Sequence, residues 1–201
     1  MIAIIDYGAG NLFSVQNALT YLNETFCITR DPAMLEGCDG MILPGVGAFR
    51  DAAWKLRQSG LADVVLEEAA AGKPLLGICL GMQMLFDKSY EYGEYSGLGL
   101  IPGVVRPIAP MIGEGKKVPH IGWNGLHFPK GATRCPIFAN ISENDCVYFV
   151  HSYAAVECDA FVTATTELTA AVAKGNVYGT QFHPEKSGEV GLRILKAFCN
   201  L

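Results

Sequence analysis

The sequence predicts an α/β fold: an open, mainly parallel central sheet flanked by helices, with an antiparallel extension. Three observations lead to this prediction. Short apolar runs alternate with helical patterns as far as Phe86, which is typical of parallel strands covered by helices. Glycine and proline then become frequent between Gly93 and Gly103. From Val104 onward apolar runs follow one another across turns, and no clear helical pattern returns before Gly188.

Strands and helices are expected in regular alternation along the first part of the chain. The expected pairs are strand Ile2 to Ile5 with helix Leu12 to Leu22, strand Gly40 to Leu43 with helix Phe49 to Leu56, and strand Pro74 to Ile78 with helix Leu80 to Phe86. A strand from Val177 to Phe182 and a helix from Gly188 to Phe198 are expected near the C-terminus. No internal repeat, low-complexity segment or linker composition interrupts the sequence, so residues 1–201 are expected to form one domain.

The composition narrows the possible classes of function. Half of the residues are hydrophobic and the formal net charge is −5, which disfavours a surface that binds nucleic acid. The seven cysteines are scattered and include no Cys-x-x-Cys pair, so neither a disulfide framework nor a metal site is expected. The start, Met1 to Asp6, meets a charge too soon for a signal peptide, and no apolar run reaches membrane-spanning length. We therefore expect a cytoplasmic protein.

The glycines near the N-terminus raise the question of a nucleotide cofactor. Gly8 and Gly10 follow a predicted strand, as in dinucleotide-binding turns, but Phe13 occupies the position of the third glycine. No cofactor is therefore expected.

A cysteine stands between a predicted strand and a predicted helix, in Gly77-Ile78-Cys79-Leu80-Gly81. This pattern is typical of a nucleophile elbow, whose sharp turn requires neighbours without side chains two positions away. Free N–H groups at the start of the helix favour a thiolate, and the Leu80 N–H would face the oxygen of a reacting carbonyl. The alternative is a buried structural cysteine, which is the commoner state of any one cysteine.

A histidine and a glutamate at the end of a predicted strand favour the catalytic interpretation. The strand ends at His183-Pro184-Glu185, and extended geometry points residues two apart in the same direction. Proline keeps His183 extended, so Glu185 can accept a hydrogen bond from one imidazole nitrogen while the other faces Cys79. A lone histidine at a strand end is more often structural, but thiol, imidazole and carboxylate together supply a nucleophile, a base and a group that orients the base.

With these residues the chain resembles the class I glutamine amidotransferases, which have a flavodoxin-like fold and a Cys-His-Glu triad in the same order. The resemblance is nearest to the glutaminase subunits of imidazole glycerol phosphate synthases. It extends over nearly the whole chain, through Asp6-Tyr7-Gly8-Ala9-Gly10-Asn11, Pro44-Gly45-Val46-Gly47, Leu76-Gly77-Ile78-Cys79-Leu80-Gly81-Met82-Gln83, Gly122-Trp123-Asn124, His151-Ser152-Tyr153 and Gln181-Phe182-His183-Pro184-Glu185-Lys186-Ser187. It implies glutamine hydrolysis through a thioester on Cys79.

The resemblance also implies roles for residues around the triad. Leu80 and the turn containing Val46 and Gly47 would supply an oxyanion hole. Such a glycine turn could instead be a simple chain reversal, but the nearby elbow favours the functional interpretation. The glutamine-binding residues implied are Gln83, Glu91, His151, Ser152 and Tyr153. Gln83 could instead cap its own helix, and Glu91 could be a surface charge. Ser89-Tyr90-Glu91 departs from the consecutive acids that these subunits usually carry, which leaves Glu91 as the matching acid.

The chain has no room for a domain that consumes ammonia, so a separate partner is expected. The resemblance implies a (β/α)₈-barrel cyclase, in a heterodimer that makes imidazole glycerol phosphate and aminoimidazole carboxamide ribotide in histidine biosynthesis. Asn11, Trp123 and Lys186 would face this partner, with Trp123 in an exposed turn between Gly122 and Asn124. Trp123 could also be a core residue.

Three other functions stay open from the sequence. The chain could be the glutaminase subunit of another synthase, such as pyridoxal phosphate synthase, or a hydrolase of γ-glutamyl peptides. It could also be a non-catalytic interaction subunit, although all three members of the triad are present.

Overall fold

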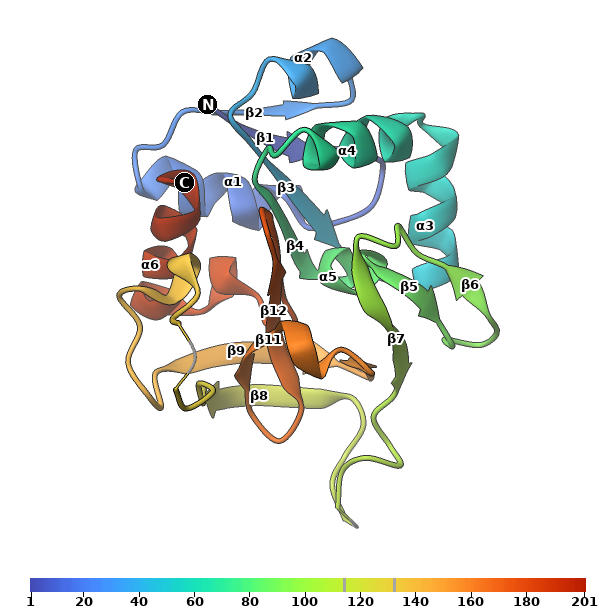
Figure 1. The fold of residues 1–201 in the computed structure, drawn as a ribbon, viewed down its shortest axis with the longest axis vertical. Helices are drawn as coiled ribbons and strands as arrows, with labels where there is room; N and C mark the ends of the chain where they lie inside the picture. The colour runs from blue at the N-terminus through green and yellow to red at the C-terminus, as the bar shows by residue number, and fades with distance from the viewer. Residues whose placement is uncertain (114, 132) are drawn as a thin grey trace.

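A seven-stranded sheet forms the centre of the molecule (Figure 1). The computed structural model describes residues 1–113, 115–131 and 133–201. Five parallel strands come first: β2 (Phe26–Thr29), β1 (Ile2–Ile5), β3 (Gly40–Gly45), β4 (Leu75–Cys79) and β13 (Val177–Thr180). Two antiparallel strands then extend the sheet beyond β13, namely β12 (Thr169–Lys174) and β11 (Val162–Thr165). The predicted mainly parallel sheet with an antiparallel extension is confirmed.

Helices cover both faces of this sheet, as Figure 1 shows. On one face lie α1 (Leu12–Tyr21) and α6 (Gly188–Cys199), and on the other lie α2 (Pro32–Glu36), α3 (Phe49–Gln58) and α4 (Leu61–Ala70). Strand alternation divides the core accordingly, because Ile2 and Ile4 pack toward the first face while Ala3 and Ile5 pack toward the second. The sequence prediction did not include β2, α2 or α4.

The helix after the elbow is shorter than predicted. It was expected to run from Leu80 to Phe86, but α5 spans Leu80–Met84 and the chain continues as strand β5 (Phe86–Ser89). Tertiary hydrogen bonds end the helix, because the Leu98 N–H donates to the Met84 carbonyl at 2.7 Å and the Leu100 N–H to the Leu85 carbonyl at 2.9 Å. A second sheet results, in the order β10 (Tyr153–Val156), β7 (Ile101–Pro107), β5 and β6 (Tyr95–Ser96).

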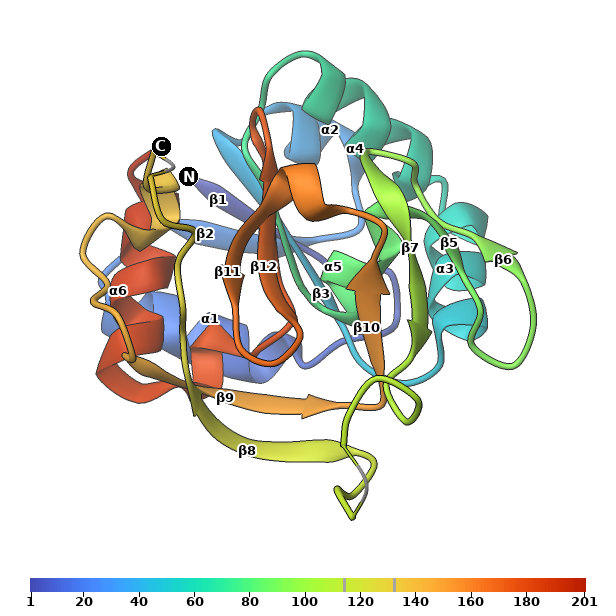
Figure 2. The ribbon, with the colours of Figure 1, turned by 60° about the horizontal axis from the view of Figure 1, so that its bottom comes forward.

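A two-stranded antiparallel ribbon of β8 (His120–Gly125) and β9 (Cys146–His151) runs along one side of the molecule (Figure 2). Trp123 lies in the middle of β8, opposite Tyr148, and its side chain is 55% exposed. Its predicted exposure is therefore correct, but the predicted turn is wrong, because strand pairing holds Gly122, Trp123 and Asn124 extended. The remaining elements are short 3₁₀ turns, η1 (Pro136–Phe138), η2 (Asp159–Phe161) and η3 (Pro184–Lys186).

No helix within residues 1–113, 115–131 and 133–201 is long and apolar enough to cross a membrane.

Candidate active site

Cys79 sits on a strained turn between β4 and α5. Its φ of 54° and ψ of −110° lie in a region that residues with side chains rarely adopt. The flanking glycines allow the turn to pack, because a Cβ on Gly81 would lie 1.8 Å from the Leu43 carbonyl oxygen and one on Gly77 would lie 2.7 Å from the Gly81 oxygen. The predicted elbow, with its steric requirement at both glycines, is present in the structure.

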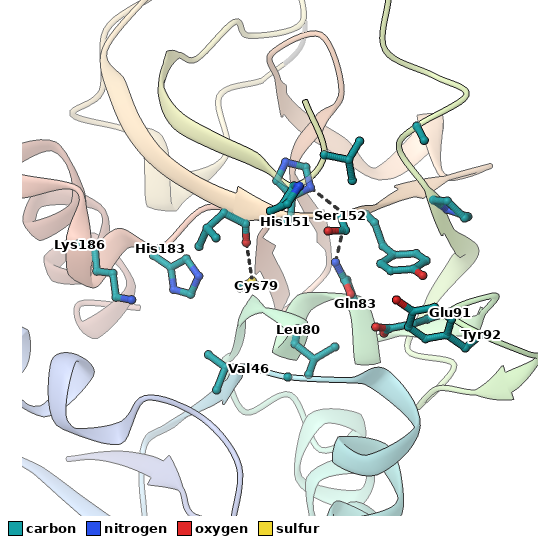
Figure 3. Close-up of a pocket in the computed structure, with 17 residues that line it drawn as sticks. Val46, Cys79, Leu80, Gln83, Glu91, Tyr92, His151, Ser152, His183 and Lys186 are labelled. Atoms are coloured by element: carbon teal, nitrogen blue, oxygen red, sulfur yellow. Dashed lines mark hydrogen bonds between the residues drawn. The ribbon is translucent and has the colours of Figure 1, made fainter. Parts of the chain in front are cut away.

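The order of the strands gathers the predicted site residues at one edge of the sheet. Strand β4 lies between β3 and β13, with Gly45 opposite Cys79 and Thr180 opposite Ile78. The segments that follow these three parallel strands therefore emerge together at their carboxyl ends. They border a cavity of about 650 Å³ lined by Val46, Gly47, Cys79, Leu80, Gln83, Glu91, Tyr92, Pro107, Ala109, Val118, Pro119, Val150, His151, Ser152, Tyr153, His183 and Lys186. In Figure 3, Cys79 lies between His183 and Gln83.

His183 and Glu185 form the hydrogen-bonded pair expected from their spacing. The Nδ1 atom of His183 lies 2.7 Å from Oε1 of Glu185, and both side chains are almost fully buried. The backbone of His183 is held on both sides, because its N–H donates to the Tyr148 carbonyl at 3.0 Å and its carbonyl accepts from the Ser187 hydroxyl at 2.6 Å. Since Glu185 occupies Nδ1, Nε2 is the nitrogen available to Cys79.

His183 carries a proton at neutral pH. Burial acts to lower the pKa of its imidazole, but hydrogen bonding with Cys79 and Glu185 opposes this and raises the pKa to about 9. The residue beside the thiol is therefore an imidazolium, which stabilises a negative charge on sulfur and can donate a proton. The Cys79 sulfur also lies 3.9 Å from the Val150 carbonyl oxygen, across the site on β9.

Gln83 faces the cavity from α5 and is 4% exposed. Its Nε2 donates to the Tyr153 carbonyl oxygen at 3.1 Å and to Oε1 of Gln181 at 3.0 Å. The alternative that Gln83 caps its own helix is therefore wrong. Tertiary contacts fix its amide at the wall of the cavity.

Glu91 lies on the wall of the same cavity and is half-buried. Its Oε2 accepts a hydrogen bond at 2.8 Å from the N–H of Phe49, the first residue of α3. Burial raises the pKa of this carboxyl group, while the bond to Phe49 acts in the opposite direction. Glu91 thus fulfils the role of an N-cap for α3, and the alternative of a free surface charge is wrong.

Comparison with known proteins agrees with this geometry. A family model described as "Glutamine amidotransferase class-I" matches residues 3–200. The chain belongs to the class I glutamine amidotransferase family.

Curated members of this amidotransferase family resemble the chain over its whole length. A protein named "Imidazole glycerol phosphate synthase subunit HisH" from Geobacillus sp. (strain WCH70) is 50% identical, covering 100% of this chain and 97% of the relative. A protein of the same name from Syntrophotalea carbinolica is 48% identical, and the match covers 100% of both.

Solved structures show the amidotransferase fold at lower identity. "Crystal structure of glutamine amidotransferase" matches with a TM-score of 0.78 and 22% identity, covering 99% of this chain and 97% of that one. "Structure of PurLQS from Thermotoga maritima" matches with a TM-score of 0.74 and 22% identity, over the same shares of the two chains.

The three residues expected to contact a partner lie on three different segments of the chain. Lys186 lines the cavity, on the turn that carries Glu185, whereas Trp123 projects from β8. Asn11 has a local role, since its side chain accepts from the Ser14 N–H at 3.2 Å and caps α1.

Two residues of this amidotransferase site were not singled out from the sequence. Gln181 lies with its Nε2 atom 3.7 Å from the Cys79 sulfur, and Ser187 accepts from the Tyr148 N–H at 3.0 Å. A signal for Gln181 exists, because it is a polar residue in an apolar strand and lies two positions before His183, on the same side of the extended chain. For Ser187 the only signal is its place at the end of the motif from Gln181 to Ser187, because its contact with Tyr148 depends on the position of β9.

Proposed function

We propose that the chain is the glutaminase subunit of an imidazole glycerol phosphate synthase, which releases ammonia from glutamine and passes it to a cyclase subunit. One observation carries this proposal. Cys79 meets the His183–Glu185 pair at the wall of a cavity, in a chain half identical to proteins named as subunits of that synthase. The products of the cyclase would be imidazole glycerol phosphate and aminoimidazole carboxamide ribotide, in histidine biosynthesis.

The first half of the reaction transfers the γ-glutamyl group to sulfur. The Cys79 thiolate attacks the carboxamide carbon, a C–S bond forms, and the carbonyl oxygen becomes an oxyanion. The Leu80 N–H and the amides of the Val46–Gly47 turn are the oxyanion donors, since β3 brings this turn beside Cys79. His183 gives its proton to the amide nitrogen and the C–N bond breaks. Ammonia departs, and the γ-glutamyl group remains on Cys79 as a thioester.

The second half releases glutamate. His183, now neutral, removes a proton from water, and the water oxygen attacks the thioester carbon. The C–S bond breaks, the sulfur leaves as thiolate, and His183 is again an imidazolium. The Glu185 carboxylate keeps the imidazole in one orientation through both halves.

The α-amino and α-carboxylate groups of glutamine would bind at the end of the cavity away from Cys79. The Glu91 carboxylate suits the substrate ammonium, while the Gln83 side chain and the backbone from His151 to Tyr153 offer hydrogen bonds. In this arrangement the substrate's side chain would extend toward Cys79.

The cyclase partner would be a (β/α)₈ barrel that receives ammonia through a closed path. Only neutral ammonia is nucleophilic, and water at neutral pH would protonate most of it, so the path must exclude solvent. Trp123, Lys186 and Asn11 would contact this partner, in a heterodimer.

Replacing the nucleophile tests the proposed function. Cys79→Ala should abolish glutamine-dependent synthesis by the assembled enzyme and leave synthesis from added ammonium salts intact, because the cyclase chemistry is untouched. Both rates are measured as formation of imidazole glycerol phosphate. The matched control is Cys146→Ala, which removes an exposed thiol from the start of β9 and should change neither rate. Loss of the ammonium-dependent rate in Cys79→Ala would contradict the assignment.

A further inference from the structure

A fully buried side-chain amide lies beside the sulfur of Cys79. Gln181 follows β13 directly, its side chain is 0% exposed, and its main-chain N–H donates to the Ala170 carbonyl at 2.8 Å. The Nε2 atom of Gln181 lies 3.7 Å from the Cys79 sulfur, within the range of an N–H···S hydrogen bond. Two side chains from one strand end, Gln181 and His183, thus reach the same sulfur.

A main-chain carbonyl fixes the direction of this hydrogen bond. The Tyr153 carbonyl oxygen can only accept, so Gln83 must turn its NH₂ group toward it, at 3.1 Å. The same NH₂ group lies 3.0 Å from Gln181, which must therefore present its oxygen to Gln83. The NH₂ group of Gln181 is left facing sulfur. The Tyr153 carbonyl thus sets the order of donors and acceptors from Gln83 to the Cys79 sulfur.

We propose that Gln181 is a positioning residue of the glutaminase site: its amide nitrogen donates to the Cys79 sulfur, and its oxygen orients Gln83. This inference rests on the proposed function. A neutral donor stabilises a thiolate without exchanging a proton with it, so His183 keeps the proton that the leaving ammonia needs. The contacts with Gln181 and Tyr153 also fix the orientation of the Gln83 amide at the cavity wall, because both engage its nitrogen.

The test replaces Gln181 with methionine, a side chain of similar length that cannot donate a hydrogen bond and accepts one only weakly. In the assembled enzyme, Gln181→Met should lower kcat for glutamine hydrolysis by about 10- to 100-fold, which is typical for loss of a hydrogen bond to a charged group. The rate of alkylation of Cys79 by iodoacetamide should reach its midpoint about one pH unit higher than in the wild type. Mass spectrometry of the peptide that contains Cys79 separates its alkylation from that of the other cysteines.

A neighbouring residue provides the matched control. Thr180 is also fully buried, and its hydroxyl has no hydrogen-bond partner among the residues that the structure describes. Thr180→Val should therefore leave kcat and the alkylation midpoint unchanged. A second variant, Gln181→Asn, keeps a buried amide, but its side chain is one methylene too short to reach both partners. The pH midpoint of Cys79 alkylation should therefore also rise in this variant.

The wild-type chain provides a measurement that needs no substitution at Gln181. Alkylation of Cys79 should shift the side-chain amide resonances of Gln181 in an ¹⁵N-labelled sample, because the hydrogen-bond acceptor is altered. Unchanged resonances, or an alkylation midpoint that does not move in folded Gln181→Met or Gln181→Asn, would overturn the inference. A lower melting temperature with an unmoved midpoint would overturn it as well, since that result indicates packing alone. If the wild-type complex uses ammonium salts but never glutamine, it is the proposed function that fails.

Discussion

His183 illustrates how single contacts determine the chemistry of this site. A buried histidine is normally neutral, because burial disfavours the charged form. Here Cys79 and Glu185 outweigh that effect and raise the pKa to about 9. His151, on the opposite wall, has no such neighbours, and burial lowers its pKa to about 4. At neutral pH His183 is therefore charged and, under the proposed function, donates its proton to the substrate. His151 is neutral and donates from Nδ1 to the Tyr153 carbonyl oxygen at 2.8 Å.

The raised pKa of His183 predicts the alkaline limit of activity. Glutamine hydrolysis by the assembled enzyme should fall as the pH rises through about 9, because His183 then loses the proton that ammonia must receive. Glu185→Gln removes one of the interactions that raise this pKa, so the fall should occur at lower pH. The measurement is glutamate formation as a function of pH. Glu189→Gln, an exposed acid in the first turn of α6, is the control and should keep the wild-type profile.

At the level of elements, the elbow depends on close packing between β3, β4 and α5. Three glycines allow it, because a Cβ at Gly45, Gly77 or Gly81 would lie less than 3.0 Å from backbone atoms of a neighbouring segment. The same packing brings the Val46–Gly47 turn against the start of α5, where the oxyanion is expected. Steric fit and catalytic geometry therefore depend on the same residues.

A methyl group at Gly81, the tightest of the three glycines around the elbow, should disrupt both stability and activity. Gly81→Ala would place a Cβ 1.8 Å from the Leu43 carbonyl oxygen, and the rigid backbone must move to accept it. We expect a loss of about 3 kcal/mol in the free energy of unfolding, measured by urea denaturation. Gly113→Ala is the control, because a Cβ there meets no described atom within 4 Å. Equal stability of the two variants would contradict the packing argument.

Across the whole molecule, the β8–β9 ribbon connects the cavity with the surface. Strand β9 supplies the Tyr148 carbonyl that holds His183, the Val150 carbonyl that faces Cys79, and His151 at the cavity wall. Strand β8 pairs with these residues and exposes Ile121 and Trp123. A partner that docks on β8 would therefore contact a strand hydrogen-bonded to the active-site wall.

This arrangement predicts a specific role for Trp123 in assembly. Trp123→Ala should weaken binding of the cyclase subunit by about 10- to 30-fold, the typical effect of losing an aromatic anchor from an interface. The change should leave the unfolding of the isolated chain nearly unaffected, since the indole is 55% exposed. Titration calorimetry measures the affinity. The control is Trp54→Ala, which removes a tryptophan that is 61% exposed on α3. If both variants bind the cyclase as tightly as the wild type, Trp123 is not part of the interface.

The sequence by itself determined the layered α/β fold and the three central residues of the site. Short apolar runs and helical apolar patterns are local, and so are the Gly-x-Cys-x-Gly turn and the His-Pro-Glu spacing, so each can be read without knowing what packs against it. The elements missed were the short β2 and α2 and the helix α4, which the predicted strand–helix pairs did not include.

Only the tertiary structure decided how the remaining polar groups are used. Gln83 and Gln181 meet across 98 positions of the chain, and Glu91 caps a helix 42 positions earlier. The length of α5 and the strand conformation at Trp123 likewise depend on partners distant in sequence. A hydrogen bond requires two groups, and a sequence pattern locates only one of them. The fold decides which partner that group meets, and the partner decides which of the two donates.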